Sequence, residues 1–141
     1  MLNLWLPFLV NRIRVKSISS NFDCMIVLLK YSFWNRNPDK SVWGGAISSS
    51  IDPFFQILMK QILLRKGIKT NFYSKSIKLH FLKKVTSDLK LIFQIKPDEI
   101  ETAEKILLKY GKYSGWHYVE GIDAYGKICI KSQVEIFLSI R

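Results

Sequence analysis

The sequence predicts an α+β fold in which a curved antiparallel sheet of about six strands wraps around one central, buried helix. Two observations predict it. Six segments have the apolar–polar alternation or the short apolar runs of strands, and two helical segments separate them into pairs. The first helical segment, Ala46–Lys66, has no polar face until its end, so a sheet must surround it to bury its side chains.

The length and composition suit one domain over residues 1–141, because single cores typically hold about 100–200 residues. The hydrophobic fraction of 48% and the aromatic fraction of 13% are typical of a packed globule. Cys24 and Cys129 stand alone without the spacing of a zinc site. We therefore expect no metal site, two inert buried thiols and a reducing, cytoplasmic location.

The chain opens with an apolar stretch, Met1–Val10, whose length is half of the roughly 20 residues that span a bilayer. It lacks the charged start and the small-residue cleavage site of a signal peptide. We expect a short lead-in helix packed on the domain and no stable membrane insertion. Contact with a membrane surface is the alternative.

The formal net charge of +11 would attract phosphates on nucleic acid, lipid or a nucleotide. The lysines are spread along the whole chain, and no module of a nucleic-acid-binding protein accompanies them. We therefore expect no nucleic-acid partner.

The first half of the chain predicts a hairpin followed by the buried helix. Residues 12–19 alternate as a half-buried strand, and residues 22–31 form a second, more buried strand after a short polar turn. Residues 32–45 are rich in turn formers and predict a loop. The helix Ala46–Lys66 follows, and Gly67 suits its end.

The second half predicts four strands and one surface helix. Strands are expected at about Lys69–Lys84 and Leu89–Ile95. Residues 96–112 carry proline and acids in their first turn and lysines in their last, as a surface helix does. The final strands, about Tyr113–Ala124 and Lys127–Ile140, form a hairpin. The resulting arrangement is the hot-dog architecture, and its open edge strands predict a homodimer, with a tetramer as a further possibility.

The stretch Trp34–Gln56 carries a specific spacing. Asn37 precedes Gly44 by seven residues, and Asp52 follows Gly45 by seven. Within this order of elements, the spacing resembles the PaaI-like branch of the hot-dog thioesterase superfamily, above all an uncharacterised family of bacterial thioesterase-like domains. The resemblance covers nearly the whole chain. It implies hydrolysis of an acyl-coenzyme A or acyl-carrier thioester, with coenzyme A present only as part of the substrate.

The resemblance also implies roles for the residues of this motif. In the resembled enzymes the helix-borne acid is a general base or nucleophile, which makes Asp52 the catalytic candidate. Gly45, at the helix start, would polarise the thioester carbonyl with its backbone N–H, and the glycine pair would let a ligand approach the backbone. Asn37 would orient water or hold the loop. Loop asparagines also bond their own backbone, which is the alternative.

A structural alternative exists for Asp52 as well. Asp followed by Pro53 is typical of a helix start, with the acid as N-cap. In that case "AISSSI" would be a separate turn, and the predicted helix would break before Asp52. A break of this kind is compatible with catalysis.

Further side chains near the motif are candidates for substrate contact. The proposed substrate-binding residues are Gly44, Trp43, Ser48, Phe81, Lys83 and Lys84. Trp43 stands where active relatives often carry histidine, so a catalytically silent hot-dog module that binds acyl chains, or serves as a structural partner, is the second hypothesis. The candidates for an acyl tunnel, with the core as the default interpretation, are Trp34, Phe54, Phe55 and Leu58. His80 and His117 are predicted to be structural or surface residues.

Overall fold

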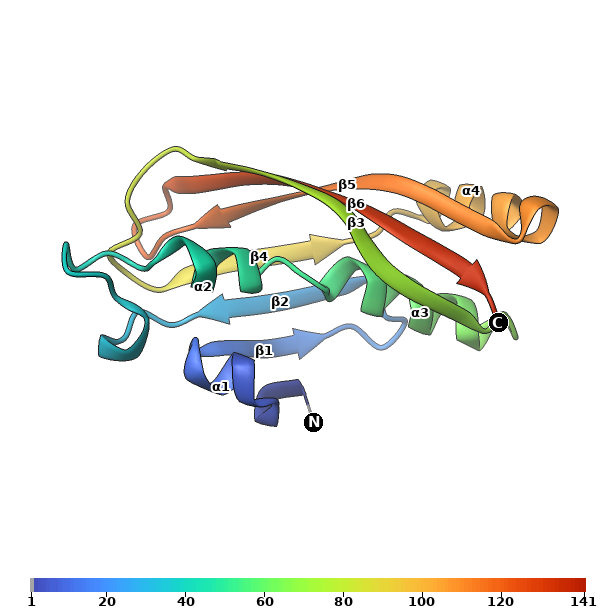
Figure 1. Cartoon of the computed structure of the whole chain (residues 1–141). Coiled ribbons are helices and arrows are strands. Elements are labelled where there is room, and N and C mark those ends of the chain that lie inside the picture. Colours follow the sequence, from blue (N-terminus) through green and yellow to red (C-terminus); the bar gives the residue numbers. More distant parts are fainter. Residues whose placement is uncertain (1) are drawn as a thin grey trace.

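A six-stranded antiparallel sheet curves around two short helices in the computed structural model, which describes residues 2–141 (Figure 1). The α+β hot-dog architecture and the predicted order of elements are confirmed. The helical segments are η1 (Leu2–Leu4), α1 (Leu6–Val10), η2 (Phe33–Asn35), α2 (Gly44–Ser49), α3 (Phe54–Arg65) and α4 (Pro97–Tyr110). The strands are β1 (Ile13–Ile18), β2 (Cys24–Leu29), β3 (Thr70–Phe81), β4 (Leu89–Gln94), β5 (Lys112–Ile122) and β6 (Ile128–Ile140).

The strand order is β1-β2-β4-β5-β6-β3, so β1 and β3 are the edges of the sheet. Strands β1, β2 and β4 lie on one side of α2 and α3, and β5, β6 and β3 arch over the other (Figure 1). The two halves meet loosely, because β4 pairs with β5 only at Lys90–Ile122 and Leu91–Gly121. Beyond these pairs the two strands separate.

Helix α3 is buried on most sides, as the missing polar face predicts. Phe54 and Phe55 both pack on Phe93 of β4, with ring centroids 5.1 and 5.0 Å apart. Leu58 is also fully buried, so these three acyl-tunnel candidates belong to the core. Trp34 does not, since 68% of it is exposed on η2.

The central helix is not continuous, contrary to the prediction for Ala46–Lys66. Helix α2 ends at Ser49, and α3 begins at Phe54. Pro53 lacks the N–H that a continuing helix would need, and its ring clashes with the preceding turn. The alternative prediction, a break in the helix before Asp52, is therefore confirmed. The prediction that Asp52 is the N-cap of the following helix is wrong. The N-cap position of α3 is Pro53, and no side chain caps this helix.

The apolar lead-in packs on the domain with Phe8 buried in the core and Leu2 partly buried against it. Phe8 is 2% exposed and stacks on Phe54 at a centroid distance of 5.3 Å. Asn3 ties η1 to the edge strand, since its amide donates to Val15 O at 3.1 Å and its Oδ1 accepts from Val15 N at 2.7 Å. Within residues 2–141 there is no helix long and apolar enough to cross a membrane.

Candidate active site

The Asp52 carboxylate lies at the break between α2 and α3 and is partly buried. Its Oδ1 accepts a hydrogen bond from Gln56 Nε2 at 3.1 Å and a second from the hydroxyl of Ser74 on edge strand β3. Among the residues described, none forms a salt bridge with Asp52. Two neutral donors therefore orient the carboxylate and leave its second oxygen free to accept a proton.

The serines at the end of α2 and its C-cap, Ser50, mainly bond carbonyls of this helix. Ser49 Oγ donates to Gly45 O at 2.8 Å, and Ser50 Oγ donates to Ile47 O at 2.6 Å. The carbonyl of Ser48 accepts from Ile51 N at 3.1 Å and closes the turn that leads to Asp52. Ser48 itself is partly buried.

The glycine pair forms the first two residues of α2. A Cβ added at Gly45 would lie 2.1 Å from Cζ3 of Trp43, so the indole ring lies over Gly45 and uses the space that glycine leaves. A Cβ added at Gly44 would meet Phe81 at 3.5 Å, an ordinary contact. Trp43, predicted to contact substrate, thus covers the backbone of Gly45, which a ligand was expected to approach.

A hollow of about 360 Å³ lies where α2 meets the end of β3. Its lining residues are Ser41, Val42, Gly44, Ile47, Phe81, Leu82, Lys83, Lys84 and Val85. Four predicted substrate-binding residues, Gly44, Phe81, Lys83 and Lys84, therefore meet in one place. Asp52, Asn37, Trp43 and Ser48 are outside this lining.

The two lysines of this hollow differ in their partners. Lys83 Nζ lies 2.9 Å from Asp123 Oδ2, and Asp123 Oδ1 accepts from the backbone N–H groups of Tyr125 and Lys127. The hydrogen bond raises the pKa of Lys83, and together with the backbone donors it holds the pKa of the Asp123 carboxyl well below its usual range. Lys83 thus anchors the β5–β6 hairpin. Lys84 is exposed and forms no salt bridge within residues 2–141.

Asn37 organises its own loop. Its Oδ1 accepts from the backbone N–H and from the hydroxyl of Ser41, both at 3.1 Å. Its backbone N–H donates to Ser41 O at 2.8 Å. These contacts are those of the loop-holding alternative.

Sequence reasoning missed the two partners of Asp52. Gln56 follows Asp52 by four residues, a spacing that brings side chains together around a helical turn and was available in the sequence. Ser74 reaches Asp52 only because β3 folds back along α3, and no local pattern signals this contact. Within the described part of the chain, no cluster of His, Cys, Asp and Glu side chains could hold a metal ion.

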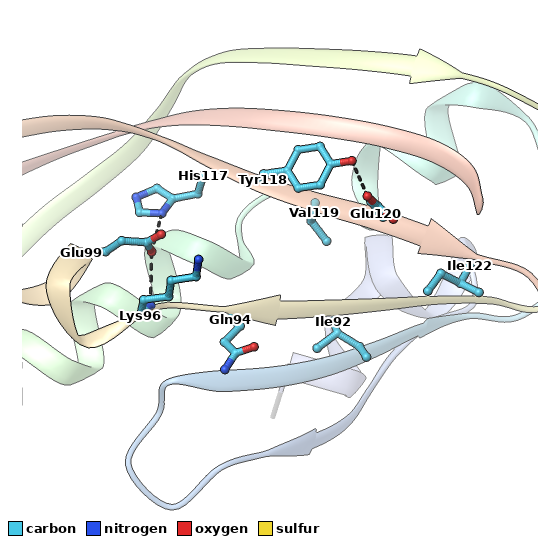
Figure 2. A pocket seen from close by; sticks show the side chains of 9 residues that line it. All are labelled: Ile92, Gln94, Lys96, Glu99, His117, Tyr118, Val119, Glu120 and Ile122. Carbon is cyan, nitrogen blue, oxygen red and sulfur yellow. Dashed lines mark hydrogen bonds and ion pairs between the residues drawn. The ribbon is translucent and has the colours of Figure 1, made fainter. Parts of the chain in front are cut away.

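A second hollow, of about 390 Å³, lies where β4 and β5 separate (Figure 2). His117, at one end, is buried with its ring 5.3 Å from that of Phe55, and its Nδ1 lies 3.3 Å from Glu99 Oε2. The distance is that of an ion pair, but neither ring nitrogen makes a well-aligned hydrogen bond with any residue described. Burial lowers the pKa of His117, and Glu99 opposes this effect. None of the predicted site residues lines this hollow.

Comparisons with known proteins relate the chain to one family and to several solved structures. A family model described as a domain of unknown function (DUF4442) matches residues 1–135. None of the curated proteins matches the sequence. A Pseudomonas aeruginosa protein of unknown function, described as a probable thioesterase, superimposes with a TM-score of 0.79 at 14% identity, over 93% of this chain and 85% of that one.

Two further solved structures are similar to the chain, one to about the same degree and one less. A Chlorobaculum tepidum protein of unknown function gives a TM-score of 0.80 at 13% identity, over 97% of this chain and 88% of the other. The E. coli PaaI protein from the phenylacetic acid degradation operon gives 0.63 at 14% identity, over 96% and 86%. At these identities the similarity establishes the fold, and the chain shares the hot-dog fold of proteins named as thioesterases.

Proposed function

This chain belongs to the DUF4442 family, and we propose that it is a thioesterase-like hydrolase that cleaves an acyl-coenzyme A or acyl-carrier thioester. The observation that carries the proposal is the position of Asp52. A partly buried carboxylate stands at a break in the central helix, held by Gln56 and Ser74 and not neutralised by any described cation. Burying such a group costs stability, and a catalytic role accounts for its presence.

In the proposed reaction, Asp52 accepts a proton from a water molecule as the water oxygen attacks the thioester carbonyl carbon. The carbon–sulfur bond then breaks, the acid and the thiol are released, and the proton passes to the thiolate. Direct attack by Asp52, giving a mixed anhydride that water hydrolyses, leads to the same products. The backbone N–H of Gly45 would stabilise the developing oxyanion at the start of α2.

The hollow beside Gly44 is the proposed place for the coenzyme A arm. Phe81 offers an apolar wall for the pantetheine, and Lys84 offers a free cation for the phosphates. Lys83 adds to the positive electrostatic potential of this hollow, although it remains paired with Asp123. Trp43 and Ser48 would face the acyl end of the substrate, near Asp52, while Asn37 holds the loop before the glycines.

The proposed working unit is a homodimer, from which a tetramer can be built. Strand β3 is an open edge of the sheet, and Ser74 on this strand contacts Asp52. Pairing of two β3 strands would extend the sheet and place a second chain beside Asp52. A cytoplasmic location, in which Cys24 and Cys129 stay reduced, completes the proposal.

One observation favours a second candidate function. The indole of Trp43 fills the space over Gly45, and Trp43 stands where active relatives often have histidine. A protein with this site closed would bind acyl chains without hydrolysing them.

The test is thiol release from short-, medium- and long-chain acyl-coenzyme A by the native protein, Asp52→Asn and the control Asp98→Asn. We expect Asp52→Asn to lose about 100-fold or more in kcat with its circular dichroism unchanged, as removal of a general base does. Asp98, exposed on α4, should be replaceable without loss. Tight acyl-coenzyme A binding without turnover by the native protein would instead establish the silent module.

A further inference from the structure

A third hollow, of about 410 Å³, lies between the lead-in segment and edge strand β1. Its lining residues are Asn3, Leu4, Phe8, Leu9, Arg12, Ile13, Arg14 and Lys30. The hollow thus combines three cations with aliphatic and aromatic side chains, and its lining contains no acid. Such a composition suits a ligand that is both anionic and apolar.

The three cations of this hollow are available to an anion. Arg12 and Arg14 are exposed, and neither forms a salt bridge with a residue in the described part of the chain. Lys30 has one acid in reach, Asp88, at 4.0 Å, and both side chains are about half exposed. An ion pair of this length and exposure contributes little and competes weakly with a new partner.

The rim of the hollow is an exposed apolar surface. Leu4 is 76% exposed and Leu6 68%, and Trp5, Leu9 and Val10 are each exposed by about half. On α1, Leu6, Leu9 and Val10 follow the spacing of one helical face, while Phe8 is buried in the core. Single exposed leucines are ordinary, but several exposed apolar side chains gathered on one short segment mark an interaction site.

The exposed surface continues beyond α1. The amide of Asn35 donates to Asn11 O at 2.9 Å, and Trp43 Nε1 donates to Asn11 Oδ1 at 3.3 Å. These bonds hold η2 and Trp43 against the end of α1, next to the exposed rings of Phe33 and Trp34. We call the exposed side chains of η1, α1 and η2, together with Arg12, Arg14 and Lys30, the N-terminal surface.

We propose that the N-terminal surface docks on an anionic lipid bilayer and lies in its interface without crossing it. Leucines and tryptophans beside arginines and lysines are the side chains that interfacial segments use. Lipid phosphates would enter the hollow between Arg12, Arg14 and Lys30, while Leu6 and Val10 enter the acyl boundary. The net charge of +11 adds long-range attraction to the same partner. This inference is independent of the proposed thioesterase activity.

The test is flotation of the whole protein with two kinds of vesicle, phosphatidylcholine alone and phosphatidylcholine mixed with phosphatidylglycerol. We expect binding only to the anionic vesicles, weakened by salt. Arg12→Gln/Arg14→Gln should weaken it roughly 25-fold, since each basic side chain near an anionic surface contributes about fivefold in binding. Leu6→Ser/Val10→Ser should weaken it too, and brominated acyl chains should quench tryptophan fluorescence, to which Trp5 and Trp34 of this surface contribute, more in the native protein than in this variant.

The matched control is Lys109→Gln/Lys112→Gln, which removes the same charge at the end of α4, on the other side of the molecule from α1 (Figure 1). It should bind as the native protein does. Three results would overturn the proposal. They are no binding to the anionic vesicles, an equal loss in the control, or a concentration-dependent oligomer that Leu6→Ser/Val10→Ser dissociates while vesicle binding persists. The last would assign this face to a second copy of the chain.

Discussion

Asp52 follows the last turn of α2 and precedes α3, yet its side chain caps neither helix. Its bonds run to Gln56, one turn ahead, and to Ser74, across the fold. The side-chain oxygens of a capping aspartate accept hydrogen bonds from backbone N–H groups at the helix start. Asp52 instead keeps an oxygen free while neutral donors fix its rotamer, which is the arrangement that a general base requires.

Ser74 is therefore predicted to be a positioning residue. Ser74→Ala should lower kcat about tenfold with KM nearly unchanged, because the carboxylate loses its orientation and the substrate contacts remain. Ser74→Thr, which keeps the hydroxyl, should restore most of the rate. The control is Ser114→Ala, on an exposed position of β5. A parallel rise of KM, or no rescue by threonine, would mean that Ser74 acts only in packing.

At the scale of elements, the separation of β4 and β5 leaves His117 beside a hollow and next to Glu99, in the first turn of α4 (Figure 2). Phe55 of α3 covers one face of its ring, and Glu99 of α4 approaches Nδ1. Tyr113, on the same strand, is buried, and burial together with Glu99 raises the pKa of its hydroxyl. Outside the core, Glu120 accepts from the Tyr118 hydroxyl and raises the pKa of Tyr118 to about 12.

The lowered pKa of His117 predicts a loss of stability in mild acid. The unfolded chain takes up a proton near the ordinary histidine pKa of about 6.5, and the buried ring resists it. Stability contributed by neutral His117 is thus complete above about pH 6.5 and falls as the pH drops below that value. Thermal unfolding from pH 7.5 to 5 should show this fall in the native protein.

The same series with His117→Phe, and with His117→Gln in case phenylalanine overpacks the site, should be flatter over this range. The Asp123 carboxyl, whose pKa is lowered, has its effect in a separate window. Its contribution is present above its usual pKa of about 3.9 and is lost below it. A slope between pH 7.5 and 5 that survives both substitutions of His117 would contradict the assignment.

At the scale of the whole molecule, the two edges of the sheet differ in what covers them. Edge strand β1 carries the lead-in segment, through the Asn3–Val15 hydrogen bonds. Edge strand β3 is twelve residues long and exposes Tyr73, Ile77 and Phe81. A long open edge with apolar side chains is unfavourable in isolation and favours pairing with another strand.

The proposed assembly through β3 predicts that Ile77→Glu shifts the protein toward the monomer. Two glutamates brought together at a symmetric strand pair would repel each other, and the lost apolar contact adds to the effect. Sedimentation velocity measures the shift, and thiol release should fall with it because the second chain lies beside Asp52 in the proposed dimer. Lys69→Gln, exposed just before β3, lowers the net charge by one unit as Ile77→Glu does and is the matched control for charge. A native protein that sediments as a monomer would contradict the proposed dimer through β3.

The sequence by itself determined the order of elements, the buried central helix and the hot-dog fold. The alternation or short apolar run of each strand, the missing polar face of α3 and the helix-start and helix-end signals of α4 are local properties, and each is found in the folded chain. The sequence also identified Gly44, Phe81, Lys83 and Lys84 as candidates for substrate contact. The structure brings these four residues together around one hollow.

Only the tertiary structure decided which partners the polar groups have. Ser74 bonds Asp52, Asp123 holds Lys83, Glu99 approaches His117, and the indole of Trp43 covers Gly45. Three of these four contacts join residues far apart in the chain, where no periodicity connects them. The fourth depends on a side-chain rotamer. Local patterns encode which faces are buried, but the partner of a buried or catalytic group depends on how the sheet curves around the helix.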